Sequence, residues 1–121
     1  MGNIDTAKIL TRVGALIILL GGFVEIGENV LYIIMDLINY GSLWLTGFIN
    51  MAGGIVAVVL GFLILLLFYP MIDTNRINAG IFILVFGLIG GIWGFWFGWV
   101  GSILCLVAGI LLFVEGTEEG A

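Results

Sequence analysis

Two long stretches without a charged residue constrain the fold of this chain more than any other feature. They run over residues 37–72 and 77–114, and the charged side chains are confined to the segments around them. A transmembrane helix needs about 20 consecutive apolar residues, within a range of about 17–25. The second stretch is therefore long enough for two crossings joined by a very tight turn. The first is long enough for one crossing, with residues left over at its start.

The composition excludes a water-soluble globule and a disordered chain. Hydrophobic residues make up 63% of the 121 residues and charged residues only 9%, whereas soluble domains average about 45–50% and about 25%. The sequence therefore predicts an integral membrane protein. A chain of this length has room for one small helical bundle and for no soluble catalytic domain beside it.

Missing residue types exclude several kinds of chemistry. The chain has no histidine, which rules out a His-ligated haem or zinc ion and a Ser-His-Asp triad. Its single cysteine, Cys105, cannot form an intrachain disulfide. With 3 basic residues against 8 acidic ones, nucleic-acid binding has no electrostatic basis. We therefore expect no enzyme activity, no cofactor and no metal, and we expect the partners to be membrane lipid, further copies of the chain or other membrane subunits.

We expect an all-α integral membrane protein with four transmembrane helices in one glycine-rich bundle, forming a single domain over residues 1–121. A short amphipathic interfacial helix is expected between the first two helices, and a tight turn around residues 97–99 between the last two. The predicted transmembrane helices cover residues 7–26, 46–69, 76–95 and 99–115, and the amphipathic segment covers residues 27–41.

Short polar side chains and one proline predict where these helices begin and end. Asp5 or Thr6 is expected to cap the first helix, and Thr74 or Asn75 the third, because their side-chain oxygens can accept hydrogen bonds from the free N–H groups of a first turn. Pro70 is expected to close the second helix, since proline lacks the N–H that a helix interior requires.

The basic residues predict the orientation in the membrane. With four crossings, the N-terminus, the loop over residues 70–75 and the C-terminus lie on one side. All three basic residues, Lys8, Arg12 and Arg76, then share that side. Because short cytoplasmic loops retain Lys and Arg, we expect a cell-membrane protein with both termini in the cytoplasm.

The four tryptophans map to the opposite ends of the predicted helices. Indole side chains concentrate at the level of the lipid headgroups, so these residues predict an interfacial aromatic belt. The last three, spaced three apart, are alternatively a stacking wall for a hydrophobic ligand. The tryptophans are Trp44, Trp93, Trp96 and Trp99.

Glycine, at 20 residues, recurs with a spacing that predicts helix packing. Small residues let helices approach closely in a membrane, and here they lie four apart on one face of three predicted helices. These faces pack within one bundle or against another chain, and the two alternatives are compatible. The residues are Gly53, Ala57 and Gly61, then Gly87 and Gly91, and finally Gly101, Cys105 and Gly109.

The same spacing suggests an internal duplication. The segments that begin at Gly53 and Gly101 resemble each other, and Arg12 and Arg76 each open the first helix of a pair. The sequence thus indicates a repeated helical hairpin over residues 7–69 and 76–115.

Polar residues after the first predicted helix form a stripe along one helical face. Each residue of the stripe lies three or four positions from another member, as on one helical face. The members are Glu25, Glu28, Asn29, Tyr32, Asp36, Asn39 and Tyr40. If Lys8 marks the inner boundary of the hydrocarbon, Glu25 lies about 25 Å away at a rise of about 1.5 Å per residue, near the outer boundary of a core about 30 Å thick. If Arg12 marks the inner boundary, Glu25 is buried several ångströms deeper.

Two interpretations of this stripe remain open. In the first, an interfacial helix turns its polar face toward water. In the second, Glu25, Glu28 and Asp36 line an entry site for a cation or proton, because carboxylates bind hard cations and exchange protons. Asn50 and Asn78 are the other strongly polar residues in the predicted helices, and we expect them to form hydrogen bonds across helices.

Two functions of different classes fit these features. The first is a non-enzymatic subunit that packs against itself or into a larger membrane complex. The second is a small oligomeric transporter or channel that uses the acidic residues at the outer end of the first helix. No pairing of a nucleophile with a base supports an enzyme.

Overall fold

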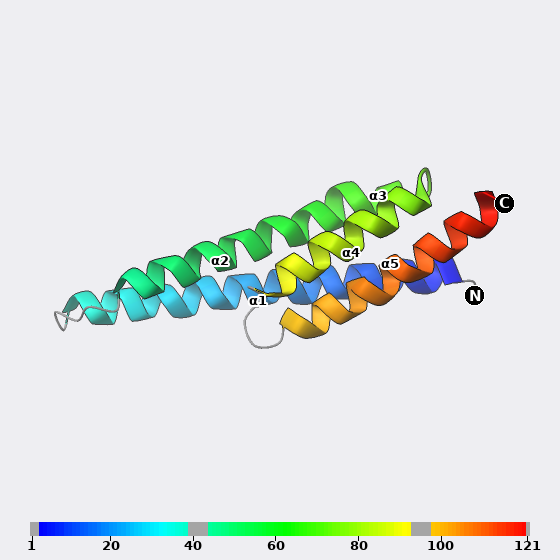
Figure 1. Ribbon diagram of the computed structural model, residues 1–121. Helices are drawn as coiled ribbons and strands as arrows, with labels where there is room; N and C mark the ends of the chain where they lie inside the picture. The colour runs from blue at the N-terminus through cyan, green and yellow to red at the C-terminus, as the bar shows by residue number, and fades with distance from the viewer. Residues whose placement is uncertain (1–2, 39–43, 93–97, 121) are drawn as a thin grey trace.

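The computed structural model describes residues 3–38, 44–92 and 98–120, which are helical except for one short turn (Figure 1). The elements are α1 (Asn3–Ile38), α2 (Trp44–Leu63), the π-helix η1 (Ile64–Phe68), α3 (Tyr69–Met71), α4 (Arg76–Ile92) and α5 (Gly98–Gly120). Three helices are long and apolar enough to cross a membrane: Ile4–Ile38, Gly47–Met71 and Gly98–Thr117. The apolar helix Arg76–Ile92 is shorter. The expected all-α fold with membrane-compatible helices is thus confirmed in this coarser form.

The expected break between the first helix and an amphipathic segment is absent, because α1 continues through residue 38. A single glycine such as Gly27 weakens a helix without ending it. The N-terminal half of α2 packs along the added turns and buries Asn29 and Ile33, while a Cβ at Gly47 would lie 2.7 Å from Ile33 Cγ1. The prediction of a separate interfacial helix was therefore wrong for residues 27–38, and residues 39–41 lie outside the described residues.

The helix boundaries also differ in smaller ways from those predicted. Asp5 and Thr6 do not cap α1, since the helix has already begun at Asn3, and Asp5 instead lies in its first turn. There its negative charge interacts favourably with the partial positive charge of the helix N-terminus. Gly98 and Trp99 belong to α5 and not to the expected turn around residues 97–99, and residues 93–97 are outside the described part of the chain.

Pro70 lies in a distorted but continuous helical rod. The backbone N–H of Tyr69 donates to the carbonyl of Ile64, five residues earlier, and helical geometry continues to Met71. A widened turn of this kind accommodates the missing N–H of a proline and the bulk of its ring. The rod therefore ends one residue after Pro70, close to where the sequence predicts.

Asn75, which directly precedes α4, is the one of the two expected residues that caps this helix. Its Oδ1 accepts a hydrogen bond of 3.3 Å from the backbone N–H of Asn78, which satisfies one of the free donors of the first turn. Thr74 instead donates from its hydroxyl to the carbonyl of Met71.

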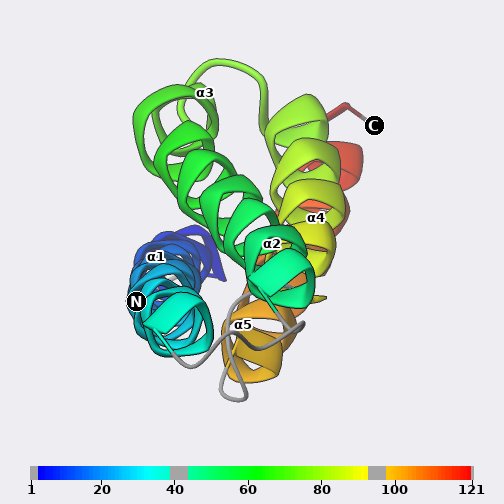
Figure 2. The same cartoon turned by 90° about the vertical axis from the view of Figure 1, so that its left-hand side faces the viewer.

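The chain forms two antiparallel hairpins that pack side by side, α1 with α2 through α3 and α4 with α5 (Figures 1 and 2). Both ends of the described chain and the α3–α4 turn lie at the same end of the molecule. The hairpins differ in length: the 36 residues of α1 span about 54 Å, and the 17 residues of α4 about 25 Å. The α1–α2 hairpin therefore extends past the ends of α4 and α5. We call this extension the arm; it comprises residues 27–38 and 44–51.

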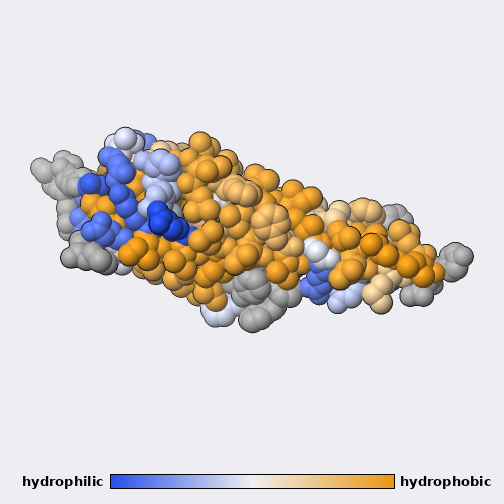
Figure 3. All heavy atoms as spheres, turned by 180° about the vertical axis from the view of Figure 1, so that it is seen from behind, coloured by the Kyte–Doolittle hydropathy of each residue, from blue (hydrophilic) through white to orange (hydrophobic). Residues whose placement is uncertain are grey.

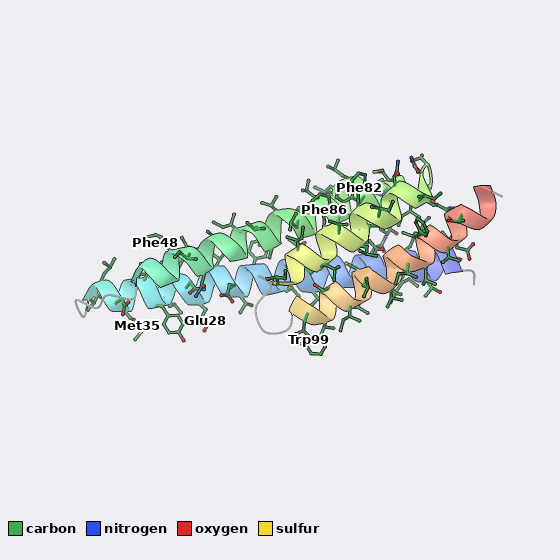
Figure 4. The ribbon with its side chains drawn as sticks, viewed as in Figure 1. Glu28, Met35, Phe48, Phe82, Phe86 and Trp99 are labelled. Atoms are coloured by element: carbon green, nitrogen blue, oxygen red, sulfur yellow. The ribbon has the colours of Figure 1, made fainter. Side chains whose placement is uncertain are left out.

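The interior of the bundle consists of small and β-branched residues together with Leu112. A stack of three phenylalanines flanks it, with the ring of Phe68 at 5.0 Å from the rings of both Phe82 and Phe86 (Figure 4). The face seen in Figure 3 is hydrophobic along most of its length; polar side chains gather at the end that holds the termini, and a smaller hydrophilic patch lies in the opposite half. The fully buried interior comprises Ala7, Ala15, Ile18, Ala57, Ile64, Ile72, Ala79, Ile83, Cys105, Ala108 and Leu112.

Candidate functional site

Glycines bring α1 into backbone contact with two other helices. A Cβ added at Gly101 of α5 would lie 2.7 Å from the carbonyl oxygen of Gly14, and one added at Gly14 would lie 2.9 Å from the carbonyl oxygen of Gly101. Farther along α1, a Cβ at Gly22 would lie 2.8 Å from the carbonyl oxygen of Gly54 on α2. These distances leave no room for any larger residue unless the helices separate.

The α4–α5 hairpin is held together in the same way. A Cβ at Gly109 would lie 2.6 Å from the carbonyl oxygen of Gly80. Gly91 faces Ser102, whose hydroxyl donates a hydrogen bond of 2.8 Å to the carbonyl of Gly87. Because Ser102 is buried, this bond satisfies a polar group that lipid could not.

The small residues singled out from the sequence are all buried: Gly53, Ala57, Gly61, Gly87, Gly91, Gly101, Cys105 and Gly109. Their partners on α1 were missed. The signal for them was present, since Ala7, Thr11 and Ala15 lie four apart and are each fully buried.

The acidic residues of α1 lie along the flank of the α1–α2 contact. The side-chain amide of Asn29 donates to the backbone carbonyl of Glu25 (2.7 Å) and to its carboxylate (3.1 Å). Glu25 and Glu28 are half-buried, and Figure 4 shows Glu28 on the arm. Asp36 is also half-buried, and its Oδ2 has no hydrogen-bond partner among the described residues.

The three carboxylates do not converge on one point. Glu25 and Asp36 are about 16 Å apart along the helix axis at a rise of about 1.5 Å per residue, which is too far to share an ion. In the described parts of the chain, no group of three or more His, Cys, Asp or Glu side chains could hold a metal ion. Asn39 and Tyr40, the last members of the stripe, lie outside these parts.

Asn50 and Asn78 differ from the expectation. Both are exposed, and within residues 3–38, 44–92 and 98–120 neither side chain is hydrogen-bonded to another helix. Each asparagine lies near a helix end, where it faces outward, so hydrogen bonds across the bundle are out of reach.

A second polar cluster joins α1 to the end of α3 near the termini. Lys8 Nζ lies 2.7 Å from Asp73 Oδ1. The Arg12 guanidinium donates a hydrogen bond of 2.9 Å to the Tyr69 hydroxyl and lies 5.1 Å from the centre of its ring. Sequence reasoning placed Lys8 and Arg12 at this end but missed Tyr69 and Asp73 as their partners.

Of the four tryptophans in the predicted aromatic belt, only Trp99 has a side chain among the described residues. Trp99, at the start of α5, is 57% exposed and points away from the bundle (Figure 4). Trp93 and Trp96 lie outside the described residues, as does the side chain of Trp44.

Comparisons with known proteins return no match to a family, to a curated protein or to a solved structure.

Proposed function

We propose that this protein is an integral membrane protein with four crossings and both termini in the cytoplasm. It acts without catalysis as an assembly subunit, in a homo-oligomer or in a larger membrane complex.

The hairpin arrangement supports four crossings. With 17 residues, α4 lies at the lower limit for a crossing, and it packs against both α2 and α5. The four helical segments α1, α2–α3, α4 and α5 alternate in direction, so both ends of the described chain lie at the same end of the molecule (Figure 1). Lys8, Arg12 and Arg76 belong to this shared end, and basic residues favour the cytoplasmic side.

The exposed apolar surface of the arm is the main observation that supports the assembly role. If Lys8 marks one boundary of the hydrocarbon, Glu25 and Glu28 mark the other, about 25–30 Å away, and the arm projects beyond it. The arm nevertheless exposes 63% of Leu31 and 70% of Ile38. Lipid tails do not cover apolar surface outside the hydrocarbon, whereas another polypeptide does.

Native mass spectrometry of the protein, extracted gently from its own membranes, tests this proposal. We expect a stoichiometric homo-oligomer or a defined complex with other membrane subunits. A monomer under conditions that preserve known membrane complexes would contradict the assembly role.

A small oligomeric transporter or channel is the second candidate, favoured by the half-buried carboxylates and by Asp36 Oδ2, which has no hydrogen-bond partner within the described ranges of the chain. Flux of protons or alkali cations through liposomes containing the protein distinguishes it from the first. If transport is the function, Glu25→Gln together with Glu28→Gln abolishes flux while the protein still folds. If assembly is the function, the double variant assembles like the wild type and neither protein supports flux.

A further inference from the structure

One face of α1 is exposed along its whole length. Its apolar residues alternate in steps of four and three, the spacing by which one helix packs along another. Every residue of the series is exposed: Ile9, Val13, Leu16, Leu20, Phe23, Gly27, Val30, Ile34 and Leu37. The series, which we call the outer face of α1, begins near the termini and continues through the arm.

Gly27 distinguishes this face from an ordinary lipid-facing surface. Of the glycines whose burial is described, all are buried except Gly27. A Cβ added there would meet nothing within 4 Å. Since glycine weakens a helix interior relative to alanine and this chain does not use the space, Gly27 fits the close approach of a helix from another molecule.

The charges of α1 permit two copies of this face to meet. Nine positions separate Glu25 from Ile34, which places them on opposite sides of the helix at about 100° per residue. Asp36 is within about 20° of Glu25 by the same geometry. The carboxylates of Glu25 and Asp36 would therefore lie on the outside of the contact between two copies, where they do not repel each other across it. Glu28 is about 100° from Gly27, at the edge of the outer face.

The length of the outer face points to a second α1 as its occupant. From Ile9 to Leu37 it spans about 42 Å, whereas the hydrocarbon core is about 30 Å thick. A helix that covers it all must cross the membrane and project from it by the same amount. Another copy of α1, inserted in the same orientation, does so in register.

The exposed area is also sufficient. Aromatic side chains bury about 150–250 Å² each, and the aliphatic side chains of this face lie at or somewhat below the lower end of that range. The eight large residues of the outer face are about half exposed, as are the neighbouring Val24, Leu31 and Ile38. Together they offer on the order of 800 Å² per copy, which is the contribution of each partner to a standard interface.

We propose that this protein forms a parallel, two-fold symmetric dimer in which the outer face of α1 packs against the same face of a second copy, within the membrane and along the arm. The inference rests on the proposed four crossings and on the proposed orientation, which the basic residues at the shared end set alike for every copy.

Cysteine cross-linking in native membranes tests the dimer. Cys105→Ala removes the single cysteine, and Leu20→Cys and Ile34→Cys then report on the membrane part and on the arm. Two exposed positions off the face serve as matched controls: Tyr32→Cys on the arm and Val107→Cys on α5. Because a disulfide requires Cβ atoms about 4 Å apart, we expect the two outer-face cysteines to cross-link at least about tenfold faster than the controls under mild oxidation.

The other outcomes overturn the dimer, and they separate it from the assembly role. Equal rates at all four positions, or cross-linking at Leu20→Cys alone, would show that the outer face does not pair along its length. If no position cross-links while native mass spectrometry finds other subunits, the dimer is wrong and the assembly role stands. If the protein is also monomeric by mass spectrometry, both are wrong.

Discussion

Gly101 and Gly27 offer a matched pair of positions at which the same substitution is expected to act in opposite directions. A Cβ at Gly101 would lie 2.7 Å from the Gly14 carbonyl oxygen and 2.8 Å from Ile18 Cγ1. The first distance is about 0.7 Å short of ordinary van der Waals contact, so α5 must move away from α1. At Gly27 the added Cβ meets nothing.

The magnitudes follow from these surroundings. Overpacking costs about 1–3 kcal/mol, and replacing a helical glycine with alanine gains about 1 kcal/mol. Gly101→Ala should therefore lower the free energy of unfolding by about 1 kcal/mol, while Gly27→Ala should raise it by up to about 1 kcal/mol. The two variants would then differ by about 2 kcal/mol, or roughly 30-fold in the unfolding equilibrium.

Unfolding with SDS in mixed micelles, followed by far-UV circular dichroism, measures this difference at dilutions where the chain is monomeric. Gly14→Ala combined with Gly101→Ala should cost less than the sum of the single changes, because the helices separate only once. If Gly101→Ala is as stable as the wild type, the α1–α5 backbone contact does not exist as described and the reasoning is refuted.

Two further predictions concern the hairpins and the orientation. Ser102→Ala removes the 2.8 Å hydrogen bond to the Gly87 carbonyl and should destabilise the protein by about 0.5–1.5 kcal/mol, measured by the same unfolding assay; no loss of stability would contradict a role for this bond. A fluorescent protein fused to the C-terminus should be fluorescent and protected from protease added to intact cells, because the basic residues favour the cytoplasmic side; a digested reporter would invert the proposed orientation.

Much of the helical architecture can be predicted from the sequence, because it depends on local chemistry. The uncharged stretches locate the apolar helices, and Pro70 and Asn75 bracket the turn between α3 and α4 at positions where backbone hydrogen bonding requires them. The faces that carry small residues are also visible, since a spacing of four returns to the same side of a helix.

The continuity of α1 could not be predicted in this way. Gly27 among acidic residues resembles a break between a transmembrane helix and an interfacial one. The continuity of the helix depends on α2, which packs antiparallel along α1 and buries Asn29 and Ile33. This packing stabilises helical turns that the local sequence alone would leave only marginally stable. The same packing turns Glu25 toward the side of α1 where α2 lies and leaves an apolar face outside.

The sequence by itself thus determined that this chain forms helices apolar enough for a membrane, where these helices lie and which of their faces are small. Hydrophobicity and helical periodicity decide those properties, and both are local. Only the tertiary structure decided which faces meet, with Gly14 against Gly101 and Gly22 against Gly54, and which face of α1 remains uncovered. Many glycine faces are interchangeable in a one-dimensional pattern, and close packing in three dimensions selects among them because backbones in contact admit only one arrangement of the helices.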